Sequence, residues 1–285
     1  MHKNTLKENN QSISFVTPWR NYNEPNLSLN TRAAISLEYE NGISHILFAK
    51  NQDEKLAIAS LTKILSSYIA LLNYDLKKEV VFSEKAVNIP EPTGLFLPSE
   101  KFFMKDLLYS VLVESSNDAI WAISEEMGTD SFVALMNQKA TEMEMKNSFF
   151  FDPVGLDPDQ SGNFNFSTAN DISKMLMYLL DQSKKDLKAD ILFEMMRTKE
   201  CDLHNSKGVF HHKVISTNRM LFDENSAVIA GKTGSSPLAQ ECLAIVIQHP
   251  KYKNGYIINV LLGSNNRFED MDKLLSWINK AYIWW

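Results

Sequence analysis

Segments typical of β-strands stand at both ends of this chain, with a long stretch of helical pattern between them. Near the start, Asn41-Gly42 joins the β-rich runs 33–39 and 43–50, and Asn-Gly between such runs is a strong hairpin signal. Near the end, short apolar runs rich in Ile and Val cover 227–230, 242–248 and 257–262. Because a short isolated hairpin is marginally stable, we expect both ends to share one sheet and the middle to form an inserted lobe. A ligand site is then expected in the cleft between the lobes.

The middle of the chain is predicted to be mostly helical, because apolar residues recur there at helical spacing. The segments concerned are 104–114, 118–127, 131–143, 168–181 and 188–199. An earlier helix is predicted to start at Ser60, since Ser is a favoured N-cap residue. A last helix is predicted after the final strand.

The length of 285 residues fits one large domain built of two lobes. Residues 1–30 are polar and rich in Asn and Ser, so we expect a flexible lead-in there. A single domain is expected over 31–285. Its α/β lobe is predicted at about 31–65 and 205–285, and its helical lobe at about 66–204.

Composition excludes several classes of protein. The chain is 44% hydrophobic and 22% charged, as in soluble globular proteins, and its net charge of −6 provides no basic face for nucleic acid. No apolar run reaches the roughly 18 residues that a membrane span needs, and the polar start predicts no signal peptide, so a membrane anchor is not visible. Cys242 lies in an apolar run and is expected to be a core residue, not the partner of Cys201 in a disulfide.

The first motif with chemical content is Ser60-Leu61-Thr62-Lys63, an S-x-x-K. Residues three apart share one face of a helix, so the Lys63 amine is predicted beside the Ser60 hydroxyl. Such an amine can activate a serine if burial or a second cation lowers its pKa. By itself the motif is expected about once by chance in a chain of this length. The alternative is a capping serine with a solvated lysine.

The second motif is an S-x-N, for which the sequence offers five candidates. They begin at Ser28, Ser115, Ser161, Ser216 and Ser264. Ser115 stands at the junction of two predicted helices in the middle lobe, where it can face the cleft, whereas the others read as lead-in or loop residues. We therefore select Ser115 and Asn117. The alternative is a polar turn between helices.

The third motif is Lys232-Thr233-Gly234, which closely follows the predicted strand 227–230. Glycine lets a substrate backbone approach a strand edge, lysine brings positive charge, and threonine brings a hydroxyl donor. A fixed triplet is expected by chance well below once per chain. The alternative is a strand-end turn with an exposed lysine.

In this order the three motifs mark class A β-lactamases and penicillin-binding proteins. The chain resembles the low-molecular-weight penicillin-binding proteins that act as D-alanyl-D-alanine carboxypeptidases, peptidase family S11. Over about residues 30–280, five segments resemble the family's P-A-S-L-T-K, S-G-N-D-A, G-L-D, S-T-A-x-D and N-T-N. These segments are 58–63, 115–119, 155–157, 167–171 and 217–218. Ser116 and Ser216 depart from the pattern, as does Ile229-Ala230-Gly231 before the third motif. The resemblance implies a serine β-lactamase/DD-peptidase-like α+β fold, with an antiparallel sheet flanked by helices and an inserted all-helical lobe.

The resemblance also implies the catalytic roles. Ser60 is expected to attack the carbonyl between two D-alanines while Lys63 takes its proton as general base. Burial and the positive charge of Lys232 are expected to lower the pKa of Lys63. Ser115 is expected to relay the proton to the leaving amine. Neither a cofactor nor a metal is expected.

The remaining site residues are expected to bind the substrate, a peptidoglycan stem peptide that ends in D-Ala-D-Ala. Asn117 would bond the substrate amide, and Lys232 with Thr233 the terminal carboxylate. The backbone N–H groups of Ser60 and Ser235 would form the oxyanion hole. The full set of expected binding residues is Asn117, Lys232, Thr233, Gly234, Ser235 and, at the carboxylate end, Arg267.

Three other functions stay open. Class A β-lactamases use a Glu in a loop after the second motif, but this chain has no Glu between Glu144 and Glu194, so an aspartate would have to substitute. The candidates are Asp152, Asp157 and Asp159. A D,D-endopeptidase shares all three motifs. A non-catalytic sensor of peptidoglycan or penicillin would keep the cleft and lose a catalytic residue.

A metal site is conceivable on paper where four ligand types cluster, although their spacing matches no zinc pattern. They are Cys201, His204, His211 and His212. We expect polar loop residues there instead.

By resemblance, the protein is expected to act outside the cytoplasm, with β-lactams as inhibitors.

Overall fold

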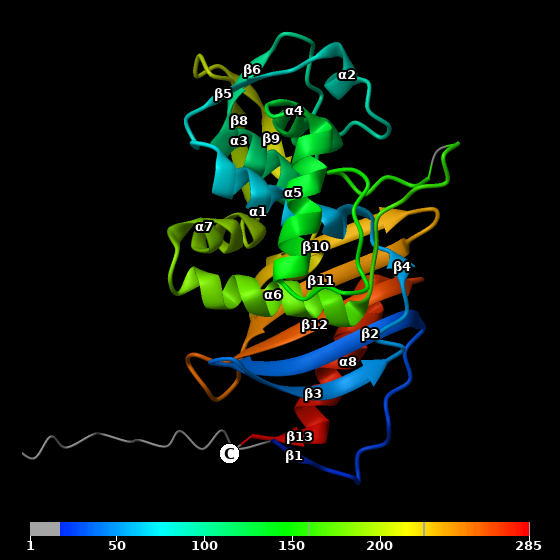
Figure 1. Cartoon of the computed structure of the whole chain (residues 1–285). Helices are drawn as coiled ribbons and strands as arrows, with labels where there is room; N and C mark the ends of the chain where they lie inside the picture. Colours follow the sequence, from blue (N-terminus) through cyan, green and yellow to red (C-terminus); the bar gives the residue numbers. More distant parts are fainter. Residues whose placement is uncertain (1–17, 159, 225, 285) are drawn as a thin grey trace, which may run out of the picture.

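The computed structural model describes residues 18–158, 160–224 and 226–284. Its centre is a five-stranded sheet in the order β10-β11-β12-β2-β3, with every neighbouring pair antiparallel (Figure 1). The strands are β2 (Thr31–Glu40), β3 (Ile43–Lys50), β10 (Val228–Ser236), β11 (Gln240–Gln248) and β12 (Tyr256–Ser264). Both ends of the chain therefore share one sheet, which confirms the predicted α+β fold. Asn41 and Gly42 both have positive φ, +48° and +84°, as a tight hairpin turn requires.

Helices cover both faces of the sheet. Helix α8 (Arg267–Ala281) packs on one face and α6 (Ala169–Ser183) on the other (Figure 1). Alternate residues of β12 join the two hydrophobic clusters: Ile258 and Val260 face the α6 side, and Ile257 faces α8. The sheet is thus buried on both sides, and this explains why its strands read as continuous apolar runs.

The inserted lobe lies on the α6 side of the sheet (Figure 1). Its helices are α1 (Thr62–Asn73), α2 (Glu84–Val87), α3 (Met104–Tyr109), α4 (Asn117–Glu125), α5 (Thr129–Glu142) and α7 (Leu187–Met196). Helix α1 runs through its centre and is buried from Thr62 to Leu71. The candidate nucleophile at its start is therefore attached to the most enclosed helix of the lobe.

Short strands complete the lobe. They pair as β4 (Leu56–Ala57) with β7 (Phe166–Ser167), β5 (Glu79–Val81) with β6 (Lys101–Phe103), and β8 (Glu200–His204) with β9 (Phe210–Ile215). The β8–β9 hairpin packs on α3 and on the turn that ends at Glu114. Nothing in the apolar pattern predicted this hairpin, because its strands are short and polar.

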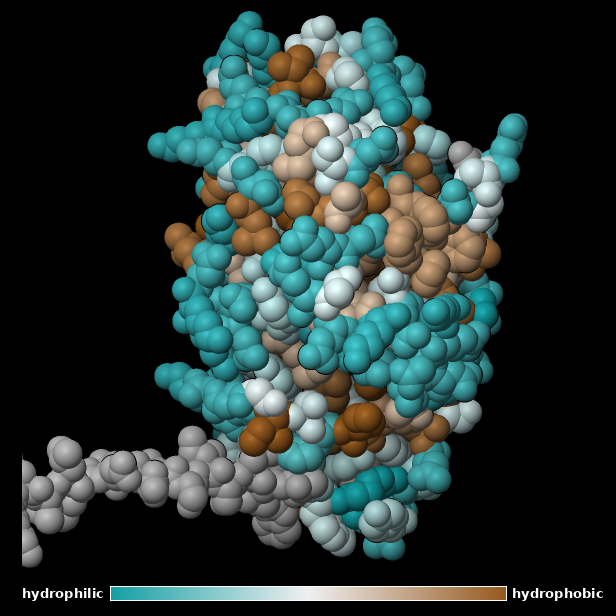
Figure 2. All heavy atoms as spheres, in the orientation of Figure 1, coloured by the Kyte–Doolittle hydropathy of each residue, from teal (hydrophilic) through white to brown (hydrophobic). Residues whose placement is uncertain are grey.

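The two ends of the described chain lie together. Strand β1 (Trp19–Arg20) pairs with β13 (Tyr282–Ile283), and the Trp277 indole donates to the Pro25 carbonyl. Residues 1–17 of the expected lead-in lie outside the described residues, and the proposed lobe boundaries stay a prediction. Within the described ranges, the helices are all too short or too polar to cross a membrane. The face drawn in Figure 2 is largely hydrophilic, with apolar residues in scattered groups.

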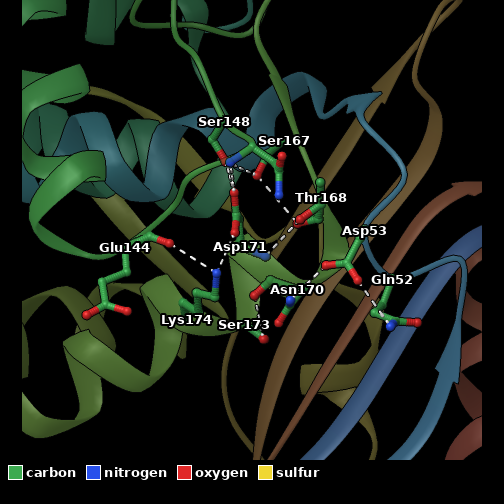
Figure 3. A network of polar contacts seen from close by, with 11 residues as sticks. Gln52, Asp53, Glu144, Ser148, Ser167, Thr168, Asn170, Asp171, Ser173 and Lys174 are labelled. Carbon is green, nitrogen blue, oxygen red and sulfur yellow. Dashed lines mark hydrogen bonds and ion pairs between the residues drawn. The ribbon is translucent and has the colours of Figure 1, made fainter.

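A buried polar network fixes the chain before α6. The Asp171 carboxylate accepts hydrogen bonds from the Asn147 amide, the Ser148 hydroxyl and the Lys174 amine at 2.7–2.9 Å (Figure 3). Thr168 caps the helix by accepting from the Asp171 amide. Both ends of the segment 147–168 are therefore fixed, and this segment supplies one wall of the candidate site.

Candidate active site

A cavity of about 670 Å³ lies between β10 and the inserted lobe. Its volume is in the range of small-molecule sites. Its wall includes members of all three motifs: Ser60, Ser115, Asn117, Thr233, Gly234 and Ser235, together with Arg267. The two motif lysines, Lys63 and Lys232, are buried at 0% and 1% exposure. The structure thus brings every predicted site residue into one place.

Ser60 lies in a 3-10 turn, Ala59–Leu61, that leads into α1. The residue before α1 is Leu61, so the prediction that Ser60 caps this helix is wrong. The Ser60 hydroxyl instead accepts a hydrogen bond of 2.6 Å from the Lys63 amine. The serine oxygen therefore contacts a side chain that can exchange a proton with it.

The Lys63 amine is held by three acceptors. It lies 2.6 Å from Ser60 Oγ, 2.6 Å from Asn117 Oδ1 and 3.2 Å from the Val154 carbonyl. Burial lowers the pKa of Lys63 to about 7, against the opposing charge of nearby carboxylates, of which Asp152 is the strongest. A large fraction of this amine is consequently neutral near neutral pH, the state in which it can accept a proton.

Ser115 occupies a strained position on the cavity wall. A π-helical turn, η2 (Ser110–Glu114), continues α3 and ends at Ser115, whose φ of 72° and ψ of 33° are left-handed. Such π-turns often occur at functional sites. Lys232 Nζ donates to Ser115 Oγ at 2.8 Å, and burial, followed by the charge of Lys63, lowers the pKa of Lys232. Ser115 is therefore bonded to the third motif across the cavity.

The third motif lies inside a strand and not after it, because β10 continues to Ser236. A β carbon on Gly234 would lie 2.8 Å from the Ile58 carbonyl oxygen and 3.2 Å from the Ser60 amide nitrogen. Glycine therefore allows β10 to pass directly beside the turn that carries Ser60.

Two further side chains complete this end of the cavity. Arg267 begins α8, and its guanidinium donates to the Gly234 carbonyl at 2.8 Å. Thr217 Oγ1 lies 2.5 Å from Thr233 Oγ1. Burial lowers the pKa of Arg267 below its ordinary value. A guanidinium and two hydroxyls thus gather where a carboxylate could bind.

The motifs did not identify several further cavity residues. Glu91, Glu114, Trp121 and Phe151 also line it. Only Glu114 carried a signal in the sequence, namely its position directly before Ser115. The rest come from loops or helix faces that only the tertiary structure brings to the cavity.

Two of the aspartates named for a β-lactamase role accept hydrogen bonds from the protein. Asp152 Oδ1 accepts from the backbone amides of Val154 and Gly155 at 2.7 and 2.6 Å, and burial raises its pKa. Asp157 accepts from the Ser236 hydroxyl and the Leu238 amide. Asp159 lies outside the described residues.

The residues considered for a metal make other contacts. His212 lies 3.0 Å from Glu114, and His204 stacks edge-on against Phe210. In the part of the chain that the structure describes, no group of three or more His, Cys, Asp or Glu is arranged to hold a metal. Cys201 and Cys242 carry free thiols.

An α+β fold in which a Ser-x-x-Lys turn faces a Lys-Thr-Gly strand defines the class of serine β-lactamases and penicillin-binding proteins. A family model described as D-alanyl-D-alanine carboxypeptidase, peptidase S11, matches residues 20–266. The chain belongs to this family.

Individual relatives agree with this assignment. The chain is 30% identical over 271 residues to the D-alanyl-D-alanine carboxypeptidase DacC of Escherichia coli, covering 88% of this chain and 61% of the relative. It is 26% identical to a D-alanyl-D-alanine endopeptidase of the same organism, covering 84% and 74%. The chain thus spans about three fifths of DacC and 54% of the carboxypeptidase DacF of Bacillus subtilis.

Solved structures show the same fold. The Streptomyces K15 DD-transpeptidase matches with a TM-score of 0.76 and 22% identity, over 90% of this chain and 99% of that one. A D-alanyl-D-alanine carboxypeptidase from Mycobacterium tuberculosis matches with a TM-score of 0.76 and 20% identity, over 91% and 96%.

Proposed function

We propose that this protein is a serine-type D-Ala-D-Ala carboxypeptidase that removes the terminal D-alanine from peptidoglycan stem peptides. One observation carries the proposal. The Lys63 amine, buried and with a pKa of about 7, lies 2.6 Å from the Ser60 hydroxyl in a cavity bordered by the Lys-Thr-Gly strand. The family to which the chain belongs and its relative DacC, both described as D-alanyl-D-alanine carboxypeptidases, support the same activity.

In the acylation step, Ser60 Oγ attacks the carbonyl carbon of the peptide bond between the two D-alanines. Neutral Lys63 takes the serine proton, and the C–N bond to the terminal D-alanine breaks as Ser115 passes a proton to the leaving amine. The products are a Ser60 ester and free D-alanine. Water then hydrolyses the ester, which returns Ser60 and releases a peptide one residue shorter.

Binding groups on both sides would hold the substrate in this geometry. Thr233, Lys232 and Arg267 would bind its terminal carboxylate, and Asn117 its amide. The backbone amides of Ser60 and Ser235 would donate to the developing oxyanion, a contribution worth about 3–4 kcal/mol per donor in other serine enzymes. We place the reaction outside the cytoplasm, because the stem peptides of the cell wall lie there.

Three alternatives are separated by product analysis. A β-lactamase would need a carboxylate to activate the deacylating water, but Asp152 is bonded within its own loop and Asp157 is bonded to Ser236 and Leu238 at the end of β10. The endopeptidase among the relatives supports cleavage of peptide cross-links as a second candidate. The intact Ser60, Lys63 and Ser115 contacts argue against a non-catalytic sensor.

The test is covalent labelling by a fluorescent penicillin, with the adduct mapped by mass spectrometry. We expect one penicilloyl group on Ser60 of the wild type and none on Ser60→Ala. Absence of an adduct on wild-type Ser60 would refute the proposal. Release of D-alanine from a pentapeptide, compared with cleavage of a cross-linked dimer, then separates carboxypeptidase from endopeptidase. Rapid turnover of nitrocefin would indicate a β-lactamase.

A further inference from the structure

Glu114 belongs to none of the three motifs, yet it ends the π-helical turn directly before Ser115 and lines the cavity. Its carboxylate accepts from the Ser110 hydroxyl at 2.6 Å, and both carboxylate oxygens lie 3.0 Å from His212 Nε2 on β9. The two side chains are only 14% and 16% exposed. Because burial raises the pKa of Glu114, these two donors are what favours its charged form.

The imidazole of His212 is itself held in one orientation. His212 Nδ1 lies 2.6 Å from His211 Nδ1, and His211 Nε2 lies 3.5 Å from a Glu100 oxygen. The His211 ring stacks on Phe96 with centroids 5.2 Å apart. The contact of Nε2 with Glu114 and the contact of Nδ1 with His211 hold the His212 ring at both nitrogens. The β9 side of the contact is therefore fixed in orientation.

The backbone on both sides of Ser115 is held by main-chain hydrogen bonds. The Thr217 amide, two residues beyond β9, donates to the Val113 carbonyl at 3.1 Å, and the Ser116 amide donates to the Ser110 carbonyl at 3.1 Å. A left-handed serine persists only where its surroundings hold it. Glu114 directly precedes Ser115. Among the hydrogen bonds of the described residues, its contact with His212 is the side-chain link between this turn and β9.

We propose that Glu114 and His212 form a positioning pair that holds Ser115 in its left-handed conformation, within reach of Lys232. The pair ties β9 to the catalytic turn, so His212 contributes to the rate of acylation through Ser115. This inference rests on the proposed acyl-transfer function. Neither residue touches the reacting atoms, and both act through Ser115.

The experiment measures the apparent second-order rate constant for acylation of Ser60 by a fluorescent penicillin. His212→Phe removes the donor and keeps a ring, whereas His212→Gln restores an N–H near the position of Nε2. We expect His212→Phe to slow acylation roughly 10–100-fold, since a small misplacement of a catalytic group has effects of this size. His212→Gln should recover most of the wild-type rate. His204 is an exposed histidine on the neighbouring strand β8, and His204→Phe is therefore the matched control, which should leave the rate unchanged.

A double-mutant cycle with Ser115→Ala then separates positioning from a general loss of structure. If the pair acts through Ser115, His212→Phe has no further effect once Ser115 is alanine. An additive loss in the double variant, or a wild-type rate in His212→Phe, would overturn the inference. Should His212→Phe lose cooperative unfolding, Glu114→Ala takes its place in the same cycle. A wild type that forms no adduct on Ser60 would instead refute the proposed function.

Discussion

Gly234 and Ser60 belong to segments so close that a single methyl group on Gly234 would meet the backbone of the turn that carries Ser60. The nearest atoms would be the Ile58 carbonyl oxygen at 2.8 Å and the Ser60 amide nitrogen at 3.2 Å. Neither atom can rotate away, since both belong to the main chain. The width of the cavity at the serine is therefore set by the absence of a side chain on β10.

Gly234→Ala is expected to slow acylation by penicillin at least tenfold, because β10 must move away from Ser60 and carries Thr233 and Ser235 with it. The rate constant for labelling of Ser60 measures this effect. Gly255→Ala is the control, since the nearest atoms to its β carbon would be side-chain atoms of His249 and Tyr252 at 3.1–3.3 Å, and these residues do not line the cavity. Equal effects of the two variants on the rate would contradict this account of Gly234.

The rate of acylation is expected to rise with pH and reach half its maximum near pH 7. Burial lowers the pKa of Lys63 to about 7, and only the neutral amine can take the proton of Ser60. Below this pH the amine is protonated and the rate falls. A pH series with a fluorescent penicillin measures the midpoint. A rate independent of pH between 5 and 9 would exclude Lys63 as the base, and Lys63→Arg should remove the activity at every pH.

Arg267→Gln is expected to raise the KM for a peptide ending in D-Ala-D-Ala roughly 10–100-fold, the range of a charge-assisted hydrogen bond. Substrate whose terminal carboxylate is converted to an amide should be insensitive to the change. Arg219→Gln provides a close control. The guanidiniums of Arg219 and Arg267 lie 4.3 and 5.1 Å from the centroid of the Phe268 ring, respectively, but Arg219 does not line the cavity. Loss of activity toward both substrates alike would show that Arg267 does not recognise the carboxylate.

Asp171→Ala is expected to lower the free energy of unfolding by about 3–5 kcal/mol, since it leaves the donors of a buried network unpaired. Urea denaturation measures the change. Asp130 is the control, because like Asp171 it lies in the first turn of a helix, here α5, but it is exposed. Asp130→Ala should lower the free energy of unfolding by at most about 1 kcal/mol. A similar cost for both variants would mean that the network of Figure 3 adds little stability.

Much of the fold follows from patterns of apolar residues. The hairpin 33–50 and the longer helices of the inserted lobe were predicted to within a few residues, because each of them buries a face with its own period, whereas the short helix α2 was not predicted. The extent of β10 was predicted too short. Its second half is polar and becomes a strand only because it pairs with β11. Short polar hairpins such as β8–β9 carry no period to detect.

The candidate site was predictable in composition and not in geometry. The order of the three motifs identified its residues, and the structure brings all of them to one cavity. The left-handed Ser115 and the bond from Lys63 to the Val154 carbonyl could not be predicted, because both depend on segments distant in sequence. Ser60 was expected to begin the helix as its N-cap, but Leu61 holds that position, whereas the predicted contact between the Ser60 hydroxyl and the Lys63 amine is present.

The pairing of β2 with β12 brings Ala33 opposite Leu262, so the central sheet cannot close until nearly the whole chain is present. Such non-local pairings form late and slowly, whereas the helical lobe contains many contacts between nearby segments. A partly folded chain can therefore have its Ser60–Lys63 turn in place while the strand of Gly234 is still unattached. Labelling by penicillin should consequently count only molecules that have completed folding, and it can serve as a kinetic probe of the last folding step.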